Sequence, residues 1–174
     1  MNTILEELTE FGELLCLKPK IKIVSPSLKD KSFFFIKNGY LQKYYSIKGK
    51  KHVFRLIESG DYCESFTVLQ GEKNNYEYIE TVSDTVIIKF DYQKSIIKIN
   101  NSLMLSNFFK DLLSNFLFFQ EKRILNFLAL SPKERYKEFI ETNYQKIGKY
   151  PDHIIASYLG ITKETFSRFR NRKS

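Results

Sequence analysis

Residues 152–174 read DHIIASYLGITKETFSRFRNRKS, and they decide how the second part of the chain folds. A short helix is predicted to start after Pro151, with an apolar face formed by Ile154, Ile155 and Leu159. Gly160 is expected to end that helix, because a residue without a β-carbon turns the chain at positive φ at little cost. Thr162 then offers a hydroxyl N-cap to a second helix, whose Phe166 faces the first. Two helices joined by a short turn that contains glycine follow the helix-turn-helix plan, whose second helix enters the major groove of DNA.

The polar side of the second predicted helix is rich in cations. From Gly160 to the last residue there are five Lys and Arg side chains against one anion, Glu164, a net charge of +4. Three of the six arginines of the chain lie within its last seven residues. Arginine presents a planar fork of donors that binds guanine or phosphate at two points. The stretch is therefore predicted to bind DNA rather than to form a solvated basic tail.

The segment IASYLGITKETFSRFR, residues 155–170, resembles the helix-turn-helix of the cyclic-AMP receptor protein / Fnr superfamily of bacterial transcription regulators. The segment SPKERY, residues 131–136, is similar to the part of those proteins that joins their long helix to the DNA-binding domain. This resemblance implies an α+β fold with three parts. They are a cyclic-nucleotide-binding-like β-roll over residues 1–101, a long dimerisation helix over residues 102–130, and a helix-turn-helix domain over residues 131–174.

The same resemblance implies roles on DNA for individual residues. It implies base contacts for Lys163, Glu164 and Arg168, and phosphate contacts for Thr162, Ser167, Arg170 and Arg172. A glutamate can accept a hydrogen bond from N4 of cytosine, and an arginine can donate to O6 and N7 of guanine. Double-stranded DNA is the expected partner, with RNA polymerase as a further partner of a transcription regulator.

Composition agrees with a packed protein that meets phosphates near its C-terminal end. The 174 residues are 43% hydrophobic and include 16 Phe and 11 Tyr, which is ample for a core. Of the net charge of +8, the part from Lys133 onward carries ten cations and five anions, hence +5. Cys16 and Cys63 are too far apart for a metal motif and are predicted to be buried apolar residues. With no basic leader and no run of eighteen apolar residues, a cytoplasmic protein without membrane contact is expected.

Before residue 91 the sequence predicts short strands separated by turns. Strand-like runs cover residues 21–24, 32–37, 40–47, 51–57, 66–69, 76–82 and 85–90. Asn38-Gly39 between two such runs predicts a hairpin, because both residues tolerate positive φ. An amphipathic helix capped by Asn2 or Thr3 is predicted ahead of the strands, with the apolar residues Ile4, Leu5, Leu8, Phe11, Leu14 and Leu15. Asp91 is expected to cap a short helix that follows them.

The β-roll of this superfamily holds a phosphate in a turn where a Gly-Glu pair meets an arginine. In the matching stretch, residues 59–66, Glu64 and Ser65 stand in place of that pair, and no arginine lies between Arg55 and Arg123. Phosphate recognition needs fixed cationic donors, so cyclic AMP is not expected to bind. The interior is instead expected to be filled by Phe66, Tyr76 and Tyr78. The effector is left open, and no cofactor or metal is expected, since His52 and His153 are the chain's two imidazoles.

A long apolar helix is predicted over residues 102–130. Leu105, Phe109, Leu112, Phe116 and Phe119 follow the 4, 3, 4, 3 spacing of a coiled-coil seam. A second stripe, formed by Leu113, Leu117, Ile124 and Leu128, lies beside it. The pattern alone fits either a buried helix of a monomer or a helix shared with a partner, and the resemblance implies a homodimer. Ser131, Pro132 and Glu134 start the next helix with a capping box, which predicts a hinge after Leu130.

These observations favour a dimeric, sequence-specific transcription regulator whose β-roll either senses a small molecule other than cyclic AMP or is a structural platform. The alternative is a nucleotide-sensing or signalling adaptor whose basic C-terminal tail binds protein or RNA. An enzyme is not expected, because no Ser–His–Asp set, carboxylate pair or metal-spaced cluster is evident in the sequence.

Overall fold

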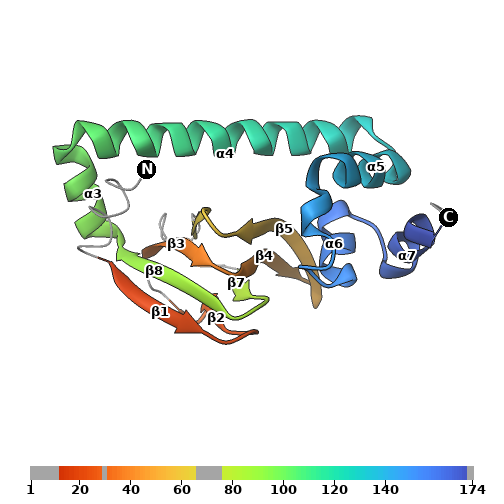
Figure 1. The fold of residues 1–174 in the computed structure, drawn as a ribbon, viewed down its shortest axis with the longest axis horizontal. Helices are drawn as coiled ribbons and strands as arrows, with labels where there is room; N and C mark the ends of the chain where they lie inside the picture. Colours follow the sequence, from red (N-terminus) through yellow and green to blue (C-terminus); the bar gives the residue numbers. More distant parts are fainter. Residues whose placement is uncertain (1–11, 29–30, 66–75, 172–174) are drawn as a thin grey trace. The chain divides into compact units, whose positions relative to one another are not determined.

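The computed structural model describes residues 12–28, 31–65 and 76–171. The chain divides into two compact units, Met1–Ser106 and Asn107–Ser174. Strands dominate the first unit and helices form the second (Figure 1). The long helix α4, Leu103–Ala129, starts in the first unit and belongs to the second from residue 107 onward.

Two antiparallel four-stranded sheets form the first unit. One sheet has the order β1-β8-β3-β6, and its strands are β1 Glu13–Leu17, β8 Thr85–Asp91, β3 Ser32–Asn38 and β6 Tyr62–Glu64. The other has the order β2-β7-β4-β5, and its strands are β2 Lys22–Val24, β7 Glu77–Thr81, β4 Tyr40–Ile47 and β5 Lys50–Glu58. Both sheets contribute to one buried cluster, formed by Val24, Phe34, Ile36, Leu41, Ile57, Cys63, Ile79 and Ile87. The two-sheet β-roll expected for the N-terminal part is therefore present.

The predicted hairpin at Asn38-Gly39 is wrong. The two flanking strands, β3 and β4, belong to different sheets and do not pair with each other. Gly39 has φ +105° and forms a corner at which the chain passes from one sheet to the other. A β-carbon at this position would lie 2.6 Å from Thr85 Oγ1 and 2.7 Å from the carbonyl oxygen of Asp84, so the corner needs glycine for space as well as for φ.

A true hairpin joins β4 to β5. Ile47 pairs with Lys50, and the two residues between them, Lys48 and Gly49, have φ +50° and +75°. Two successive positive φ values match the twist of the strands on either side, which is why such turns are common in two-residue hairpins. The turn expected between the strand-like runs 40–47 and 51–57 is therefore present, although Lys50 belongs to β5.

The predicted N-terminal helix is wrong where the structure describes it. Leu14 and Leu15 lie in strand β1 and pair with Ile88 and Ile87 of β8. The spacing of these apolar residues favours a helix, but pairing with β8 provides backbone hydrogen bonds to the whole segment and decides the structure. Residues 1–11 with the predicted cap, and the predicted strand at residues 66–69, lie outside the described residues.

The predicted strands over residues 76–82 and 85–90 are confirmed as β7 and β8. Asp91 caps α3, Tyr92–Asn101, as predicted, because its Oδ1 accepts a hydrogen bond of 2.9 Å from the backbone N–H of Lys94.

The second unit contains most of α4 and the shorter helices that follow it. These are α5 Pro132–Asn143, the 3-10 turn η1 Tyr144–Lys146, α6 Asp152–Leu159 and α7 Lys163–Asn171. The predicted capping box at the start of α5 is confirmed: the backbone N–H of Ser131 donates to Glu134, and the N–H of Glu134 donates to Ser131 Oγ. The buried side chains of α5 to α7, with Tyr150, form one small core: Tyr136, Phe139, Tyr150, Ile154, Ile155, Ala156, Leu159 and Phe166.

Candidate nucleic-acid interface

Helices α6 and α7 are joined by a short turn at the residues predicted from the sequence. Gly160 ends α6 in the left-handed region at φ +67°, and its N–H donates to the carbonyl oxygen of Ser157 at 3.1 Å. Thr162 Oγ1 accepts a hydrogen bond of 3.2 Å from the N–H of Thr165, which caps the start of α7. The turn between the helices therefore comprises Gly160, Ile161 and Thr162, as the sequence predicted.

Aromatic packing on α5 fixes the position of α7. Phe166 is fully buried, and its ring lies 5.4 Å from the ring of Tyr136 in an edge-on arrangement. Tyr136 also lies 5.5 Å from the ring of Phe169. Because both contacts come from one face of α7, the opposite face is turned to solvent.

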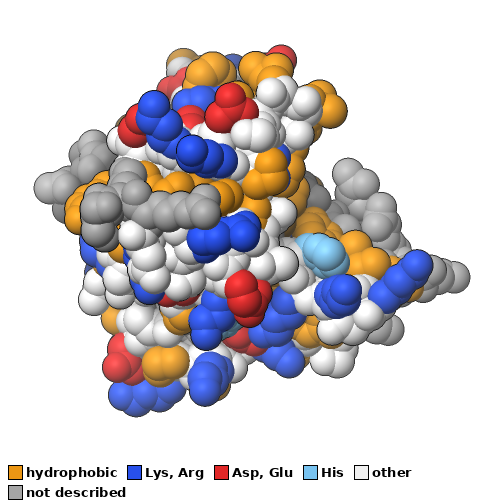
Figure 2. Space-filling view, turned by 90° about the vertical axis from the view of Figure 1, so that its right-hand side faces the viewer, with side chains coloured by type: hydrophobic (Ala, Val, Ile, Leu, Met, Phe, Trp, Pro, Cys, Tyr) orange, Lys and Arg blue, Asp and Glu red, His pale blue; other side chains and the backbone are white. Residues whose placement is uncertain are grey.

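The exposed face of α7 carries most of the predicted DNA contacts. Five of the residues predicted to contact DNA are exposed: Thr162, Lys163, Glu164, Arg168 and Arg170. Ser167 is half-buried. Arg172 lies outside the described residues. Exposed Lys and Arg side chains are also visible in Figure 2, together with some Asp and Glu side chains. Such a surface attracts a polyanion.

Glu164 is the acid on this cationic face. Hydrogen bonds from its own backbone N–H and from the hydroxyl of Thr162 hold the pKa of its carboxyl below the ordinary value. The carboxylate is consequently ionised at neutral pH and can only accept hydrogen bonds. Glu164 and Arg168 are four residues apart, so they lie on the same side of α7, one turn from each other.

Arg170 already has a protein partner. Its Nη1 lies 2.9 Å from Oδ1 and 2.7 Å from Oδ2 of Asp152, the first residue of α6. The ion pair joins the start of α6 to the end of α7 and braces the two helices. A phosphate bound by Arg170, as predicted, would therefore have to share the guanidinium group with the carboxylate of Asp152.

Two arginines that were not predicted from the sequence bind the C-terminal end of α6, directly before the turn. Arg123 of α4 donates from Nη2 to the carbonyl oxygen of Tyr158 at 2.8 Å, and Arg135 of α5 donates from Nε to that of Leu159 at 3.1 Å. The available signal for Arg123 was weak, because this residue ends the polar run Gln120–Arg123 directly before the mostly apolar segment ILNFLAL.

Helix α4 exposes a large apolar surface. The second predicted stripe is exposed throughout, with exposed fractions of 50% for Leu113, 57% for Leu117, 59% for Ile124 and 81% for Leu128. The predicted seam is more covered: Phe109, Leu112 and Phe116 are half-buried, although Phe119 is exposed. Leu105 is fully buried and belongs to the first unit, so its side chain is not available to a partner.

A buried charge cluster lies at the turn expected to hold a phosphate. Nζ of Lys43 lies 2.5 Å from Glu77 Oε1 and donates to the carbonyl oxygen of Glu64 at 2.9 Å. The hydroxyl of Ser65 donates to the other carboxylate oxygen of Glu77 at 2.8 Å. Burial raises the pKa of Glu64, and nearby Lys43 and Arg55 oppose that shift. The sequence analysis missed Lys43, a lysine inside the apolar run of β4 and 4% exposed.

The predicted filling of the β-roll interior is partly wrong. Tyr76 is 58% exposed, so it does not point into the core. Tyr78 is half-buried, and its ring stacks on that of Tyr44 with centroids 4.9 Å apart. Phe66, the third residue of that prediction, lies outside the described residues. The buried cluster itself is formed by aliphatic residues of both sheets, together with Phe34 and Cys63.

Within the described residues, no helix combines the length and the apolarity needed to cross a bilayer. In the same residues, His, Cys, Asp and Glu side chains form no group of three that could hold a metal ion.

No family model matches the chain, and no curated protein matches it. Several solved structures, in contrast, are similar to the chain. FixK2 from Bradyrhizobium japonicum aligns with a TM-score of 0.79 at 15% identity, over 92% of this chain and 83% of that one. A CooA variant from Carboxydothermus hydrogenoformans aligns with a TM-score of 0.77 at 16% identity, over 95% of this chain and 78% of that one. A protein from Eubacterium rectale described as a Crp/Fnr-family regulator aligns with a TM-score of 0.67 at 16% identity, over 99% and 83%.

At these identities the likeness concerns the fold. The chain has the Crp/Fnr fold, a cyclic-nucleotide-binding-like β-roll followed by a helical region, as the sequence resemblance implied.

Proposed function

We propose that this protein is a homodimeric transcription regulator that binds specific DNA sequences through α7. The observation that carries the proposal is a capped helix α7 whose buried face is fixed by Tyr136 and whose exposed face is cationic, set on a Crp/Fnr fold. A helix held in this way can enter the major groove without distortion, because its orientation is set by packing and not by the DNA.

The base-reading residues are proposed to be Lys163, Glu164 and Arg168. All three are exposed near the start or middle of α7, and Glu164 and Arg168 lie on the side opposite the buried Phe166. Glu164 accepts from N4 of cytosine, while Arg168 and Lys163 donate to guanine. Phosphate contacts are assigned to Thr162, which directly precedes Lys163, to Ser167, which directly precedes Arg168, and to Arg170 and Arg172.

Changing Glu164 or Arg168 to alanine is expected to relax the base preference at one position of each half-site. Each change removes a pairing worth about 1–3 kcal/mol. Selection of bound sequences from a random DNA pool by the purified variants measures the effect. Ser167→Ala is the control, because losing a phosphate contact weakens all sequences alike.

An unchanged selected motif in both alanine variants would contradict the base-contact assignment. A wild-type protein that selects no motif would favour the alternative, a signalling adaptor whose basic end binds protein or RNA without reading a sequence.

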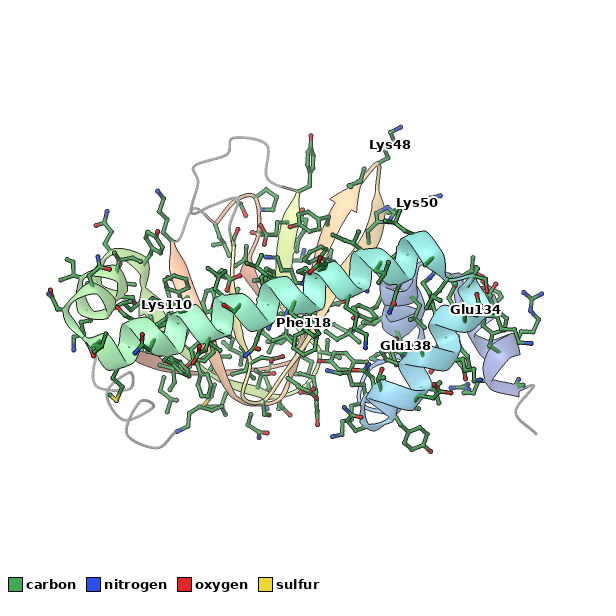
Figure 3. All side chains as sticks on the ribbon, turned by 90° about the horizontal axis from the view of Figure 1, so that it is seen from above. Lys48, Lys50, Lys110, Phe118, Glu134 and Glu138 are labelled. Carbon is green, nitrogen blue, oxygen red and sulfur yellow. The ribbon has the colours of Figure 1, made fainter. Side chains whose placement is uncertain are left out.

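The exposed apolar stripe of α4 is proposed to be covered by a second copy of the chain. Leu113, Leu117, Ile124 and Leu128 would otherwise leave a contiguous apolar strip in water, which monomeric proteins rarely do. Figure 3 looks onto α4 and shows Phe118 at mid-helix on the viewer's side; this side chain is 62% exposed. A repeat of three and four residues suits self-association of two helices about a two-fold axis. We therefore place the dimer contact on this exposed stripe and not on the seam predicted from the sequence. Leu105, which is fully buried, is not part of the proposed contact.

Leu117→Glu is expected to convert the dimer to a monomer and to weaken operator binding strongly. The change places a charge in the centre of the proposed seam, where it would be desolvated on association. Sedimentation at micromolar concentration measures the assembly. Asn115→Glu, at an exposed polar position of the same helix, is the control and should remain dimeric. A monomeric wild-type protein under these conditions would contradict the proposal.

In the dimer, two copies of α7 would meet successive major grooves about 34 Å apart. The operator is therefore expected to be a near-palindrome. RNA polymerase is a further proposed partner, and a cytoplasmic location goes with this function. No catalytic activity is proposed, since the solved structures of similar fold named above are described as regulators or carry no enzymatic description.

Cyclic AMP is proposed not to be the effector. Two described cations lie at the expected phosphate turn, and both are already paired: Lys43 is buried against Glu77, and Arg55 lies 3.7 Å from Asp61. The carboxyl of Glu64 lies nearby. Calorimetry with cyclic AMP or cyclic GMP is expected to show no binding heat at about 100 µM ligand. Operator affinity should be unchanged by either nucleotide, because a ligand shifts an equilibrium only by its differential affinity for the two states. Micromolar affinity for cyclic AMP would overturn this part of the proposal.

A further inference from the structure

The C-terminal end of α6 is held by arginines from two other helices. The last carbonyl groups of a helix have no partner within the helix and must find one elsewhere. Here the carbonyl oxygen of Tyr158 accepts from Arg123 of α4 at 2.8 Å, and that of Leu159 accepts from Arg135 of α5 at 3.1 Å. Both cations also lie at the negative end of the α6 dipole, which stabilises them there.

Arg123 is packed as well as hydrogen-bonded. The centre of its guanidinium group lies 3.9 Å from the ring centroid of Tyr158 and 4.8 Å from that of Phe127. Burial lowers the pKa of this guanidinium, while its contacts with Tyr158 act in the opposite direction. A half-buried cation that is stacked and hydrogen-bonded is costly to pull out of place, because its partners would be left unsatisfied.

Phe127 connects the two arginines to the turn. Its ring lies 4.7 Å from the guanidinium group of Arg135, on which it also stacks. A β-carbon on Gly160 would lie 2.7 Å from Cε1 of the same ring, so the turn approaches α4 as closely as glycine permits.

The junction between α4 and α5 is bridged at the same place. Arg135 donates from Nη1 to the carbonyl oxygen of Leu130 at 2.7 Å, and so binds both the end of α4 and the end of α6. Ser131 and Glu134 close the capping box at the next residues. Lys122 and Glu138 add an ion pair of 3.2 Å between α4 and α5.

We propose that Arg123, Phe127 and Arg135 form a clamp that makes α7 move with the C-terminal part of α4 as one body. The hinge predicted after Leu130 is then absent, because movement there would break the hydrogen bonds to three carbonyl groups and separate two stacked pairs, Arg123 on Tyr158 and Arg135 on Phe127. Arg123 is a positioning residue in this account: it contacts no DNA, and it acts by setting where α7 lies.

The consequence for DNA rests on the proposed function. If two copies associate through α4, a rigid connection between α4 and α7 fixes the distance between the two reading helices. The protein should then tolerate little change in half-site spacing, because adding a base pair moves one half-site by about 3.4 Å and rotates it about the duplex axis. A protein with a free hinge would adapt to that change.

The clamp itself is tested without DNA, by hydrogen exchange on the full-length protein. Arg123→Ala is expected to speed exchange by at least about tenfold at the α4–α5 junction, residues 128–133, and at the turn, residues 159–162. Lys110→Ala, an exposed lysine of the same helix, is the control and should leave both segments as in wild type. Arg123→Lys should be intermediate, since it keeps the charge but not the planar stack.

Phe127→Leu is the second variant in case Arg123→Ala does not fold, and it should speed exchange in the same two segments. Wild-type exchange rates in both segments of either folded variant would overturn the clamp. This result is independent of DNA, so it separates failure of the clamp from failure of the proposed function.

Half-site spacing is the second readout. Wild-type affinity for a near-palindromic operator is expected to fall by more than about thirtyfold when one base pair is inserted at its centre. In Arg123→Ala that loss should shrink to a few-fold, while affinity for the original spacing falls. Arg168→Ala is the control: it should lower affinity at both spacings in parallel. An equal spacing penalty in wild type and Arg123→Ala would contradict the role of Arg123 in positioning α7.

Discussion

Replacing Lys43 by methionine is expected to destabilise the β-roll by about 3–5 kcal/mol, because it leaves the carboxylate of Glu77 buried without its cation. Glu77 is fully buried and Lys43 is 4% exposed, so water cannot replace the lost partner. Urea titration with hydrogen exchange read at β4 and β7 measures the free energy of unfolding of the first unit. A local probe is needed because the two units need not unfold together.

A second lysine–glutamate pair in the same sheet provides the control. Lys51 lies 3.4 Å from Glu80, but its side chain is 53% exposed. Lys51→Met should therefore cost no more than about 1 kcal/mol. The double change Lys43→Met with Glu77→Leu should recover most of the lost stability, because an apolar pair replaces the ion pair. Equal effects of Lys43→Met and Lys51→Met would contradict the importance of burial for the first pair.

Gly160→Ala is expected to destabilise the second unit by about 2–5 kcal/mol and to remove operator binding. An alanine at φ +67° costs about 1–2 kcal/mol, and forcing its β-carbon against Phe127 costs about 1–3 kcal/mol more. Thermal unfolding followed by hydrogen exchange of α6 and α7 measures the first effect, and a gel-shift titration measures the second.

Gly148→Ala is the matched control for this change. Gly148 also has positive φ, +81°, but a β-carbon there would meet nothing within 4 Å. It should show the backbone cost alone, about 1–2 kcal/mol. The difference between the two variants isolates the contact with Phe127, and equal losses would show that this contact contributes nothing.

The α6–α7 pair could be predicted residue by residue because its signals are local. Gly160 at the helix end, Thr162 at the next cap and Phe166 on the inner face each act within a few residues of their own position. The capping box at Ser131 is of the same kind.

The errors arose where a partner distant in sequence decides the structure. Leu14 and Leu15 suit a helix locally, but strand β8, more than seventy residues away, pairs with them. Asn38-Gly39 has the composition of a hairpin turn, and whether the flanking strands pair or separate into two sheets depends on β8 and β6 as well. Lys43 could not be recognised as a buried residue, because its partner Glu77 lies 34 positions further along the chain, the difference of the two residue numbers.

The seam on α4 illustrates a different limit. Two apolar stripes follow the helical repeat, and their spacing does not say which of them is covered. Exposure distinguishes most of their members: Leu105 is fully buried, whereas Leu113 and Leu117 are at least half exposed, although Phe119 of the first stripe is exposed as well. The assignment of the stripe to a second copy remains a prediction for sedimentation to decide.

Both arginines of the clamp bind main-chain oxygen atoms of α6. Main-chain oxygen atoms are the same whatever the side chain, so the attachment of the helix pair is insensitive to substitutions at Lys163, Glu164 or Arg168. Under the proposed function, the side chains that contact bases can therefore change without loosening the attachment of α6 and α7 to the rest of the second unit. New operator preferences could be acquired at these three positions by single substitutions, in evolution or by engineering, with no compensating change in α4 or α5.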